Sequence, residues 1–295
     1  MNNGKPQRSH AEIETLRREF AANGLIVLPG ELGPEEVTAL TGVLDHLDKT
    51  VPQNTQRRPR QHGDVLELRN CVVRAKEFME LVDRPLMLEL LGVLLGFNIQ
   101  MGNSHCFIRP PAPPGTSVAE QAGNGWHHDL VGTAVPVNGR LPHLATRVGW
   151  FLTPLAEPNS GSIYVVPGSH RASGRPPWDP ATDRPYCALE LRVAAGTAVV
   201  FDNRLWHATA PNWSGQPRKN ICMEYCPRWL RPFDYRAYGD DVLAGASAVR
   251  RQLLGDDFTS IEDGDLGYQQ PSPADVPLKG WMAERGWDVP ALVGD

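Results

Sequence analysis

The sequence predicts a mainly β protein with flanking helices, whose β segments form a sandwich or a jelly roll. Eight short apolar segments follow one another between residues 99 and 225, without helical segments among them. Glycine (28 residues) and proline (27 residues) are densest between residues 109 and 217, where they mark frequent turns. The residues before and after this region have helical periodicity. We therefore expect helices packed around one β core.

Three helices and one short strand are predicted before residue 97. A capping box at residues 9–12 begins the first helix, and a glycine suits its C-terminal cap. Residues 25–28 form an apolar segment typical of a strand. The other two helices begin at Pro34 and Pro85, because proline is favoured in the first turn of a helix. The polar stretch 52–64 is predicted to be a loop.

The strand-like segments begin at residue 99 and are short, with turn residues between them. The predicted strands are 99–109, 125–131, 146–155, 162–166, 188–193, 197–201, 205–210 and 218–225. A weak helical pattern follows over residues 241–254. We expect one domain over residues 1–295. It would comprise a helical scaffold (about 9–96), a jelly-roll core (about 97–228) and a C-terminal tail (about 229–295).

The composition favours a soluble cytoplasmic protein that acts on a small molecule. Acidic residues (34) outnumber basic ones (29), which argues against a nucleic-acid or anionic-membrane partner. No apolar run approaches the ~18 residues of a membrane span, and the N-terminus lacks the apolar segment of a secretory signal. The five cysteines contain no Cys-x-x-Cys pair, so neither a disulfide framework nor a zinc knuckle is indicated. The oligomeric state is left open.

The tripeptide His-x-Asp occurs at residues 46–48, 62–64 and 127–129. On a strand its two side chains share one face, because side chains alternate. The first copy lies in a helical pattern and the second in the polar loop. Only the third lies in a predicted strand, after a glycine-rich turn. With a histidine from another strand it would form the facial triad of non-haem iron(II) oxygenases, which leaves coordination positions open.

A late strand supplies the expected third ligand. His207 and Thr209 share one face of segment 205–210, and Arg218 begins the next strand after a turn. A hairpin would bring Arg218 beside Thr209, where a guanidinium and a hydroxyl suit the distal carboxylate of a dicarboxylate cosubstrate. Two other classes stay open at this point. One is a non-catalytic jelly-roll protein that binds a metal or ligand, and the other is a cupin-like metal-dependent hydrolase or isomerase.

Taken together, these residues make the sequence resemble the phytanoyl-CoA hydroxylase (PhyH)-like family of Fe(II)- and 2-oxoglutarate-dependent dioxygenases. The similarity extends from the first helix to about Pro227, in the family's order and spacing. The matching segments are 126–129 (Trp-His-His-Asp), 149–155, 159–171 (which contains Val-Val-Pro-Gly-Ser-His-Arg), 206–209 (Trp-His-Ala-Thr) and 218–221. The resemblance implies a double-stranded β-helix (jelly-roll, cupin-like) core and a need for Fe(II), 2-oxoglutarate and O2.

The resemblance also implies roles for individual residues. The implied iron ligands and catalytic residues are His127, Asp129 and His207. The implied cosubstrate contacts are Arg218, which would anchor the distal carboxylate of 2-oxoglutarate, and Thr209, Trp150 and Asn103. The sequence departs from the family at Phe107, where a polar residue is expected.

The implied reaction is hydroxylation, or another oxidation, of an unactivated C–H bond with release of succinate and CO2. Halogenating relatives replace the iron-binding carboxylate with a small residue, so the presence of Asp129 favours hydroxylation. The substrate would be a small organic molecule in specialised metabolite biosynthesis, since the features of acyl-CoA binding are not found here. The long loops 110–124 and 171–185 are the expected lids.

Overall fold

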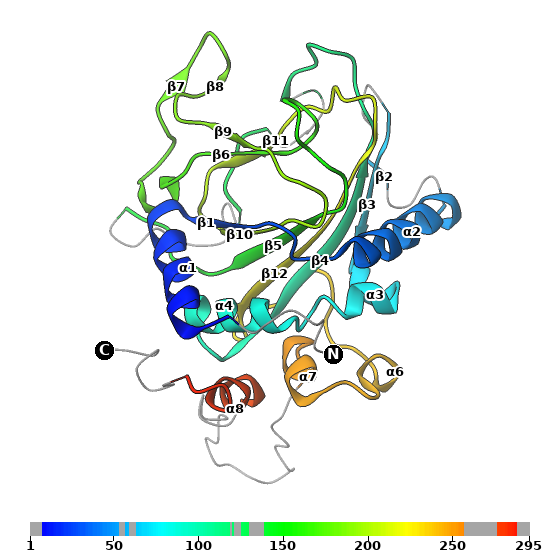
Figure 1. The fold of residues 1–295 in the computed structure, drawn as a ribbon, viewed down its shortest axis with the longest axis vertical. Coiled ribbons are helices and arrows are strands. Elements are labelled where there is room, and N and C mark those ends of the chain that lie inside the picture. The colour runs from blue at the N-terminus through cyan, green and yellow to red at the C-terminus, as the bar shows by residue number, and fades with distance from the viewer. Residues whose placement is uncertain are drawn as a thin grey trace.

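The structure is a computed structural model that describes residues 8–52, 57–58, 63–118, 120, 125–129, 139–256 and 276–287. Two β-sheets face each other, and helices lie along the outer side of the larger one (Figure 1). The strands of the large sheet run in the spatial order β1 (Leu25–Leu28), β10 (Ala198–Asp202), β5 (Thr146–Phe151), β12 (Arg218–Pro227), β4 (Ile99–Arg109), β3 (Val65–Arg69) and β2 (Arg57–Arg58). Every pairing in it is antiparallel.

A smaller antiparallel sheet covers part of the large one. Its order is β11 (His207–Thr209), β6 (Ile163–Val165) and β9 (Leu189–Leu191). A separate two-stranded ribbon, β7 (Trp178–Asp179) with β8 (Arg184–Pro185), projects beyond it (Figure 1). The apolar side chains between the two sheets form a small cluster of their own, and this cluster includes Phe151, Val165 and Phe201.

The helices bury the other face of the large sheet. They are α1 (His10–Asn23), α2 (Pro34–Thr50), α3 (Lys76–Met79), α4 (Pro85–Leu95), α6 (Asp240–Leu243), α7 (Ala248–Leu253) and α8 (Pro277–Ala283), with 3-10 turns at Cys71–Val73 and Ser169–Arg171. Residues from α1, α4, α7 and α8 join the central strands in one apolar core. None of the described helices combines the length and the apolar character needed to cross a membrane.

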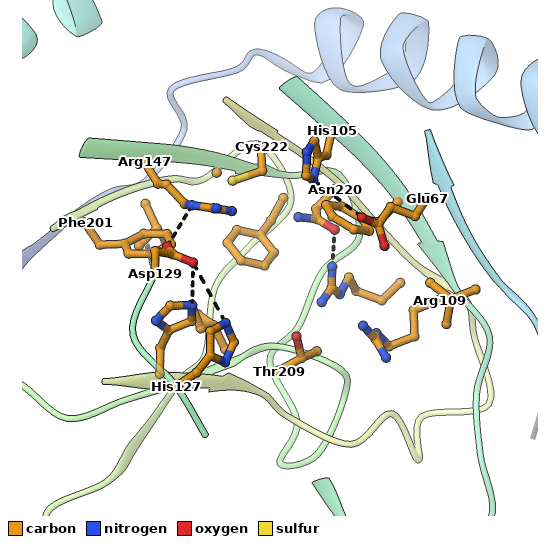
Figure 2. Close-up of a pocket in the computed structure, with 18 of the residues that line it drawn as sticks. Glu67, His105, Arg109, His127, Asp129, Arg147, Phe201, Thr209, Asn220 and Cys222 are labelled. Atoms are coloured by element: carbon orange, nitrogen blue, oxygen red, sulfur yellow. Dashed lines mark hydrogen bonds and ion pairs between the residues drawn. The ribbon is translucent and has the colours of Figure 1, made fainter. Parts of the chain in front are cut away.

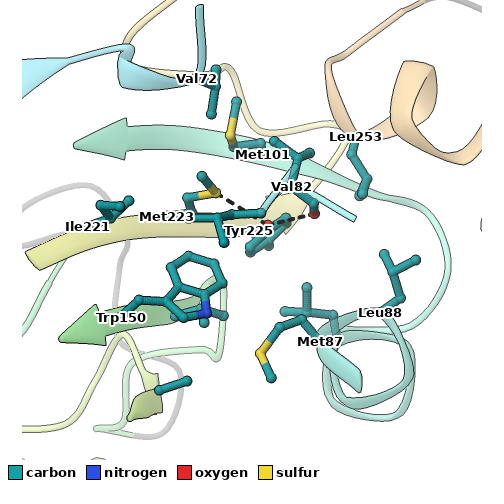
Figure 3. Packing of buried hydrophobic residues seen from close by; sticks show 14 of the residues in the cluster. Val72, Val82, Met87, Leu88, Met101, Trp150, Ile221, Met223, Tyr225 and Leu253 are labelled. Atoms are coloured by element: carbon teal, nitrogen blue, oxygen red, sulfur yellow. Dashed lines mark hydrogen bonds between the residues drawn. The ribbon is translucent and has the colours of Figure 1, made fainter. Parts of the chain in front are cut away.

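Side chains on the central strands alternate between this core and the space between the sheets. Trp150 and Met223 are on the helix side and belong to the same apolar cluster as Met87 (Figure 3). Their neighbours Gly149 and Cys222 are on the other face of these strands and line a cavity between the sheets. Period-two alternation therefore gives each strand an apolar face and a site-forming face.

The local signals for the N-terminal elements are confirmed. Ser9 accepts from the backbone N–H of Glu12 in a capping box, and Gly24 caps α1 with φ +78°. The helices predicted at Pro34 and Pro85 begin there. The strand predicted at residues 99–109 has the observed bounds of β4.

Two predicted elements differ from the structure, and short strands occur that were not predicted. Within the described part of segment 125–131, only His127 pairs, as an isolated bridge to His207; Gly125 has φ +60°, which an extended strand does not allow. The predicted helix 241–254 divides into α6 and α7. Strand β3 was not predicted, although its alternation of apolar and polar residues is typical of a strand. Strand β2 lies inside the stretch 52–64, which was predicted to be a loop. The division into scaffold, core and tail stays a prediction.

Candidate active site

A cavity of about 220 Å³ lies between the two sheets (Figure 2). One wall is the concave face of the large sheet, to which β10, β5, β12, β4 and β3 contribute side chains. The opposite wall carries Ile163, His207 and Thr209 of the small sheet. The residues after Gly125 close one side. Polar and charged groups dominate this lining although the cavity is inside the protein.

The cavity contains one group of potential metal ligands within the described residues, formed by His127, Asp129 and His207. One ligand atom from each lies within 4.8 Å of the others. The distance from Asp129 Oδ1 is 3.9 Å to His127 Nε2 and 4.0 Å to His207 Nε2. Two nitrogens and one carboxylate oxygen around a single point make the facial triad geometry of non-haem iron(II) sites.

Backbone hydrogen bonds place the three residues. His127 and His207 exchange two of them, with N···O distances of 2.9 Å and 2.8 Å. The backbone N–H of Asp129 donates to the carbonyl of Asn203 in the turn between β10 and β11 (2.7 Å). This turn therefore fixes Asp129 and also leads the chain to His207.

The histidine rings are oriented for metal binding. His127 Nδ1 donates to the Gly125 carbonyl (3.0 Å), and His207 Nδ1 donates to the Leu205 carbonyl (2.8 Å). In the neutral form of each ring, this bond makes Nε2 the unprotonated nitrogen, and both Nε2 atoms face Asp129. An Nδ1–H bonded to a backbone carbonyl is the usual support of a metal-ligating histidine, so the residues fit an iron ion.

The charges at the triad agree with this fit. Burial lowers the pKa of His207 to about 4, so its ring is neutral near pH 7. Burial alone would raise the pKa of Asp129. Arg147 and the neighbouring histidines together lower this pKa by more than burial raises it, so the pKa is below its ordinary value and the carboxylate is ionised. A neutral imidazole and an ionised carboxylate are the protonation states that a metal ligand needs.

The other end of the cavity is basic. Arg218, only 5% exposed, donates through Nε to the Gly161 carbonyl (2.8 Å) and through a terminal nitrogen to Asn220 Oδ1. No carboxylate of the described residues forms an ion pair with it. Arg109 lies directly opposite in the β12–β4 register, and burial together with Arg109 lowers the pKa of Arg218 to about 9. Two buried cations side by side favour an anion between them.

The predicted site residues divide into two groups. The structure brings His127, Asp129, His207, Thr209 and Arg218 to one cavity. It does not bring Trp150 or Asn103 to the cavity wall.

The position of Trp150 does not allow the cosubstrate contact that the family resemblance implies. Trp150 is fully buried on the helix side of β5, whereas Gly149 and Phe151 on either side of it line the cavity. Asn103 is on the cavity face of β4, but its side chain ends in a hydrogen bond to Glu224 (2.9 Å). Alternation along β5 predicts this orientation of Trp150 once Phe151 is placed in the cavity.

Sequence reasoning missed several cavity residues, of which Arg147 is the most important. It lies beside Asp129 with Nε 2.7 Å from Asp129 Oδ2. The other missed residues are Glu67, Arg69, His105, Arg109, Asn220 and Cys222. The sequence did contain a sign of Arg147, because a charged residue inside the apolar segment 146–151 must have a charged partner or a functional role. Of the other His-x-Asp copies, His46 and Asp48 are in α2, and His62 lies outside the described residues.

Comparison with known proteins identifies the family. Residues 20–220 match the family model of phytanoyl-CoA dioxygenase (PhyH). The chain belongs to the PhyH family. The match covers both β-sheets as far as Asn220 and includes all three residues of the triad and Arg218.

Individual relatives share fewer than 30% of their aligned residues with this chain. A Mycobacterium tuberculosis protein, Rv1501, is 28% identical over 225 residues, which cover 73% of this chain and 76% of the relative. A probable α-ketoglutarate-dependent hypophosphite dioxygenase from Stutzerimonas stutzeri is 23% identical over 81% of this chain and 88% of its own. The crystal structure of the epimerase SnoN with Fe3+, α-ketoglutarate and nogalamycin RO aligns with a TM-score of 0.56. Its identity is 20%, over 75% of this chain and 85% of its own.

Family and geometry together establish the enzyme class. The fold is the double-stranded β-helix of the PhyH family. The protein is an Fe(II)- and 2-oxoglutarate-dependent dioxygenase, in which His127, Asp129 and His207 form the candidate facial triad. This result decides between the three classes that the sequence left open, in favour of the oxygenase.

Proposed function

We propose that this dioxygenase hydroxylates an unactivated C–H bond of a small organic molecule in specialised metabolite biosynthesis. The observation that carries the proposal is the shared cavity, which has a metal-binding triad at one end and a buried, carboxylate-free Arg218 at the other. When bound, iron(II) and 2-oxoglutarate supply the oxidising chemistry, and the protein supplies the orientation.

The roles of the residues follow from their positions. His127, Asp129 and His207 would hold the iron through Nε2, Oδ1 and Nε2. Arg218 would bind the distal carboxylate of 2-oxoglutarate, since a guanidinium offers a carboxylate paired hydrogen bonds. The hydroxyl of Thr209, on the opposite wall, is available to the same carboxylate. The cavity is too small for a bulky substrate together with the cosubstrate, so we infer that only the reacting part of a larger molecule enters it.

Two features support hydroxylation and the substrate class. Asp129 retains the carboxylate that halogenating relatives lack. The structural neighbour SnoN is an epimerase from nogalamycin biosynthesis that was solved in complex with nogalamycin RO, which supports a role in specialised metabolism. Small-molecule substrates are thus the common feature, and hydroxylation in this chain is the finer proposal. A cytoplasmic location and lids at residues 110–124 and 171–185 stay predictions.

The test is a direct assay of the purified protein. Under anaerobic conditions, addition of iron(II) and 2-oxoglutarate should give a visible charge-transfer band. With O2, ascorbate and a panel of small-molecule candidates, succinate should form together with a product that is 16 mass units heavier. His127→Ala serves as the control and should show neither band nor succinate. The absence of the band in the unaltered protein would rule out the proposal, whereas succinate with an unshifted mass would replace hydroxylation by another oxidation.

A further inference from the structure

The two carboxylate oxygens of Asp129 have different surroundings. Oδ1 faces both ligand nitrogens, at 3.9 Å and 4.0 Å. Oδ2 is turned to the other side and lies 2.7 Å from Arg147 Nε. Figure 2 shows Arg147 and His127 on opposite sides of this carboxylate. Oδ2 accepts no hydrogen bond from the described part of the chain, so the charge of Arg147 is what holds this oxygen away from the metal position.

Arg147 is itself fixed by a row of polar residues across three strands. Its Nε donates to Glu224 Oε2 (3.1 Å), and Glu224 Oε1 accepts from Asn103 Nδ2 (2.9 Å). The antiparallel register places Glu224 directly opposite Arg147 on β5 and Asn103 on β4. Glu224 is 1% exposed, so its two hydrogen bonds are made without competition from water. The row can hold the guanidinium in one orientation.

The position of this row suggests that it orients the metal ligand Asp129. An arginine with only 19% of its side chain exposed is costly to place between two carboxylates, and it would not be needed to pair β5 with β12. Its position at the cavity wall, in contact with Asp129, gives it a task at the site. Residues that contact metal ligands in this way orient them and adjust their affinity.

We propose that Arg147 is a positioning residue that keeps Asp129 a one-oxygen ligand, and that Glu224 and Asn103 hold Arg147 in place for this purpose. The inference rests on the proposed metal site. If Oδ2 were released, it would take up a coordination position that the facial triad leaves open for cosubstrate and dioxygen. Arg147 would thus preserve reactivity at the expense of metal affinity, since its positive charge repels the cation.

Arg147→Gln separates this role from simple structural support. Co(II) should bind to the metal-free variant about three- to tenfold more tightly, because one positive charge that repels the cation across a partly solvated distance is lost. The rate of O2-dependent 2-oxoglutarate decarboxylation should nevertheless fall about ten- to a hundredfold. A structural role would weaken both quantities together. Titration of the metal-free protein with Co(II) and a succinate assay measure the two effects.

Glu224→Gln should shift Co(II) affinity in the opposite direction. Oδ1 of Asn103 has no hydrogen-bond partner, so the Asn103 amide can turn and accept from the new amide, which keeps the row intact. The negative charge beside Arg147 is lost, and Co(II) should bind a few-fold more weakly. This variant also provides the test if Arg147→Gln does not fold.

Arg84→Gln is the matched control. Arg84 is also held by two carboxylates, Glu31 at 3.2 Å and Glu36 at 2.6 Å, but it does not line the cavity. Its loss should lower the unfolding temperature without changing Co(II) affinity or decarboxylation per folded molecule. The inference is overturned if Arg147→Gln weakens Co(II) binding, if it leaves decarboxylation unchanged, or if Glu224→Gln tightens binding. If the unaltered protein binds no metal and consumes no 2-oxoglutarate, the proposed function itself fails.

Discussion

The two faces of the large sheet use the same strands for opposite purposes. On the helix side, Trp150 and Met223 are completely buried among apolar neighbours (Figure 3). On the cavity side, Arg147 and Asn220 (Figure 2), and also Arg218, are largely buried, but among charged and polar groups. The first face stabilises the fold through removal of apolar surface from water. The second face costs folding energy that is recovered when ligands bind. Substitutions on the two faces should therefore affect different quantities.

The largest expected effect is on activity, from loss of a triad member. Asp129→Ala should reduce succinate formation by at least about a thousandfold, since residues that act as a unit lose function together. Because neighbouring charges hold the pKa of Asp129 below its ordinary value, its ionised form stabilises the folded state near pH 7, so the unfolding temperature of the metal-free protein should fall, but only modestly. Succinate assays and thermal unfolding would be measured on one preparation. A large fall in the unfolding temperature would contradict the claim that cavity-side substitutions mainly affect activity.

Trp150→Ala should have the largest effect on stability. Removal of a fully buried indole leaves a cavity in the helix-side core and should cost about 3–5 kcal/mol of unfolding free energy. Because the side chain points away from the cavity, the KM for 2-oxoglutarate should not change in the fraction that stays folded. Chemical denaturation and initial-rate kinetics would test this. A strong rise in that KM would restore the cosubstrate contact expected from the family.

Arg218→Met should weaken 2-oxoglutarate binding but stabilise the ligand-free protein. Loss of the charge-assisted hydrogen bonds to the distal carboxylate should weaken 2-oxoglutarate binding by about 2–3 kcal/mol, a factor of roughly 30 to 150. The ligand-free protein should gain about 1 kcal/mol of stability. The reason is that burial and Arg109 lower the pKa of Arg218, which means that the folded state disfavours its charge. Isothermal titration and thermal unfolding without cosubstrate would measure both. A destabilised ligand-free variant would contradict this interpretation of the basic end.

The smallest effect is expected from Gly149→Ala. A Cβ at this position would lie 3.9 Å from both Phe151 Cε2 and the Val199 carbonyl oxygen, which is ordinary contact. The substitution should add about 0.5 kcal/mol of stability by restricting the unfolded chain. It also narrows the cavity by one methyl group, so we expect a severalfold rise in the KM of the substrate. An unchanged KM would place the substrate away from this part of the wall.

The local parts of the fold could be predicted from the sequence, and the pairings between distant strands could not. The cap at Ser9, the start at Pro34 and the bounds of β4 depend on neighbouring residues, and all were predicted. The separate helices α6 and α7 and the single bridge at His127 depend on packing and were not.

The candidate site shows the same limit. The triad and Arg218 could be proposed because they occur in short motifs with a recognisable order. The contact of Arg147 with Glu224 joins residues 77 positions apart, and only the strand register brings them together. Trp150 was placed near the cosubstrate by analogy with relatives, although the alternation of β5 puts it on the opposite face from Arg147.

The mutual backbone hydrogen bonds of His127 and His207 have a consequence for how the enzyme acquires its ion. Because backbone groups, and not the metal-binding side chains, make these bonds, we expect chain folding itself to bring the two ligand-bearing segments together. Iron(II) would then bind to a site that is already formed in the folded protein. In a zinc finger, by contrast, metal binding drives folding. A chelator should accordingly yield an inactive but intact protein that regains function when iron(II) is returned.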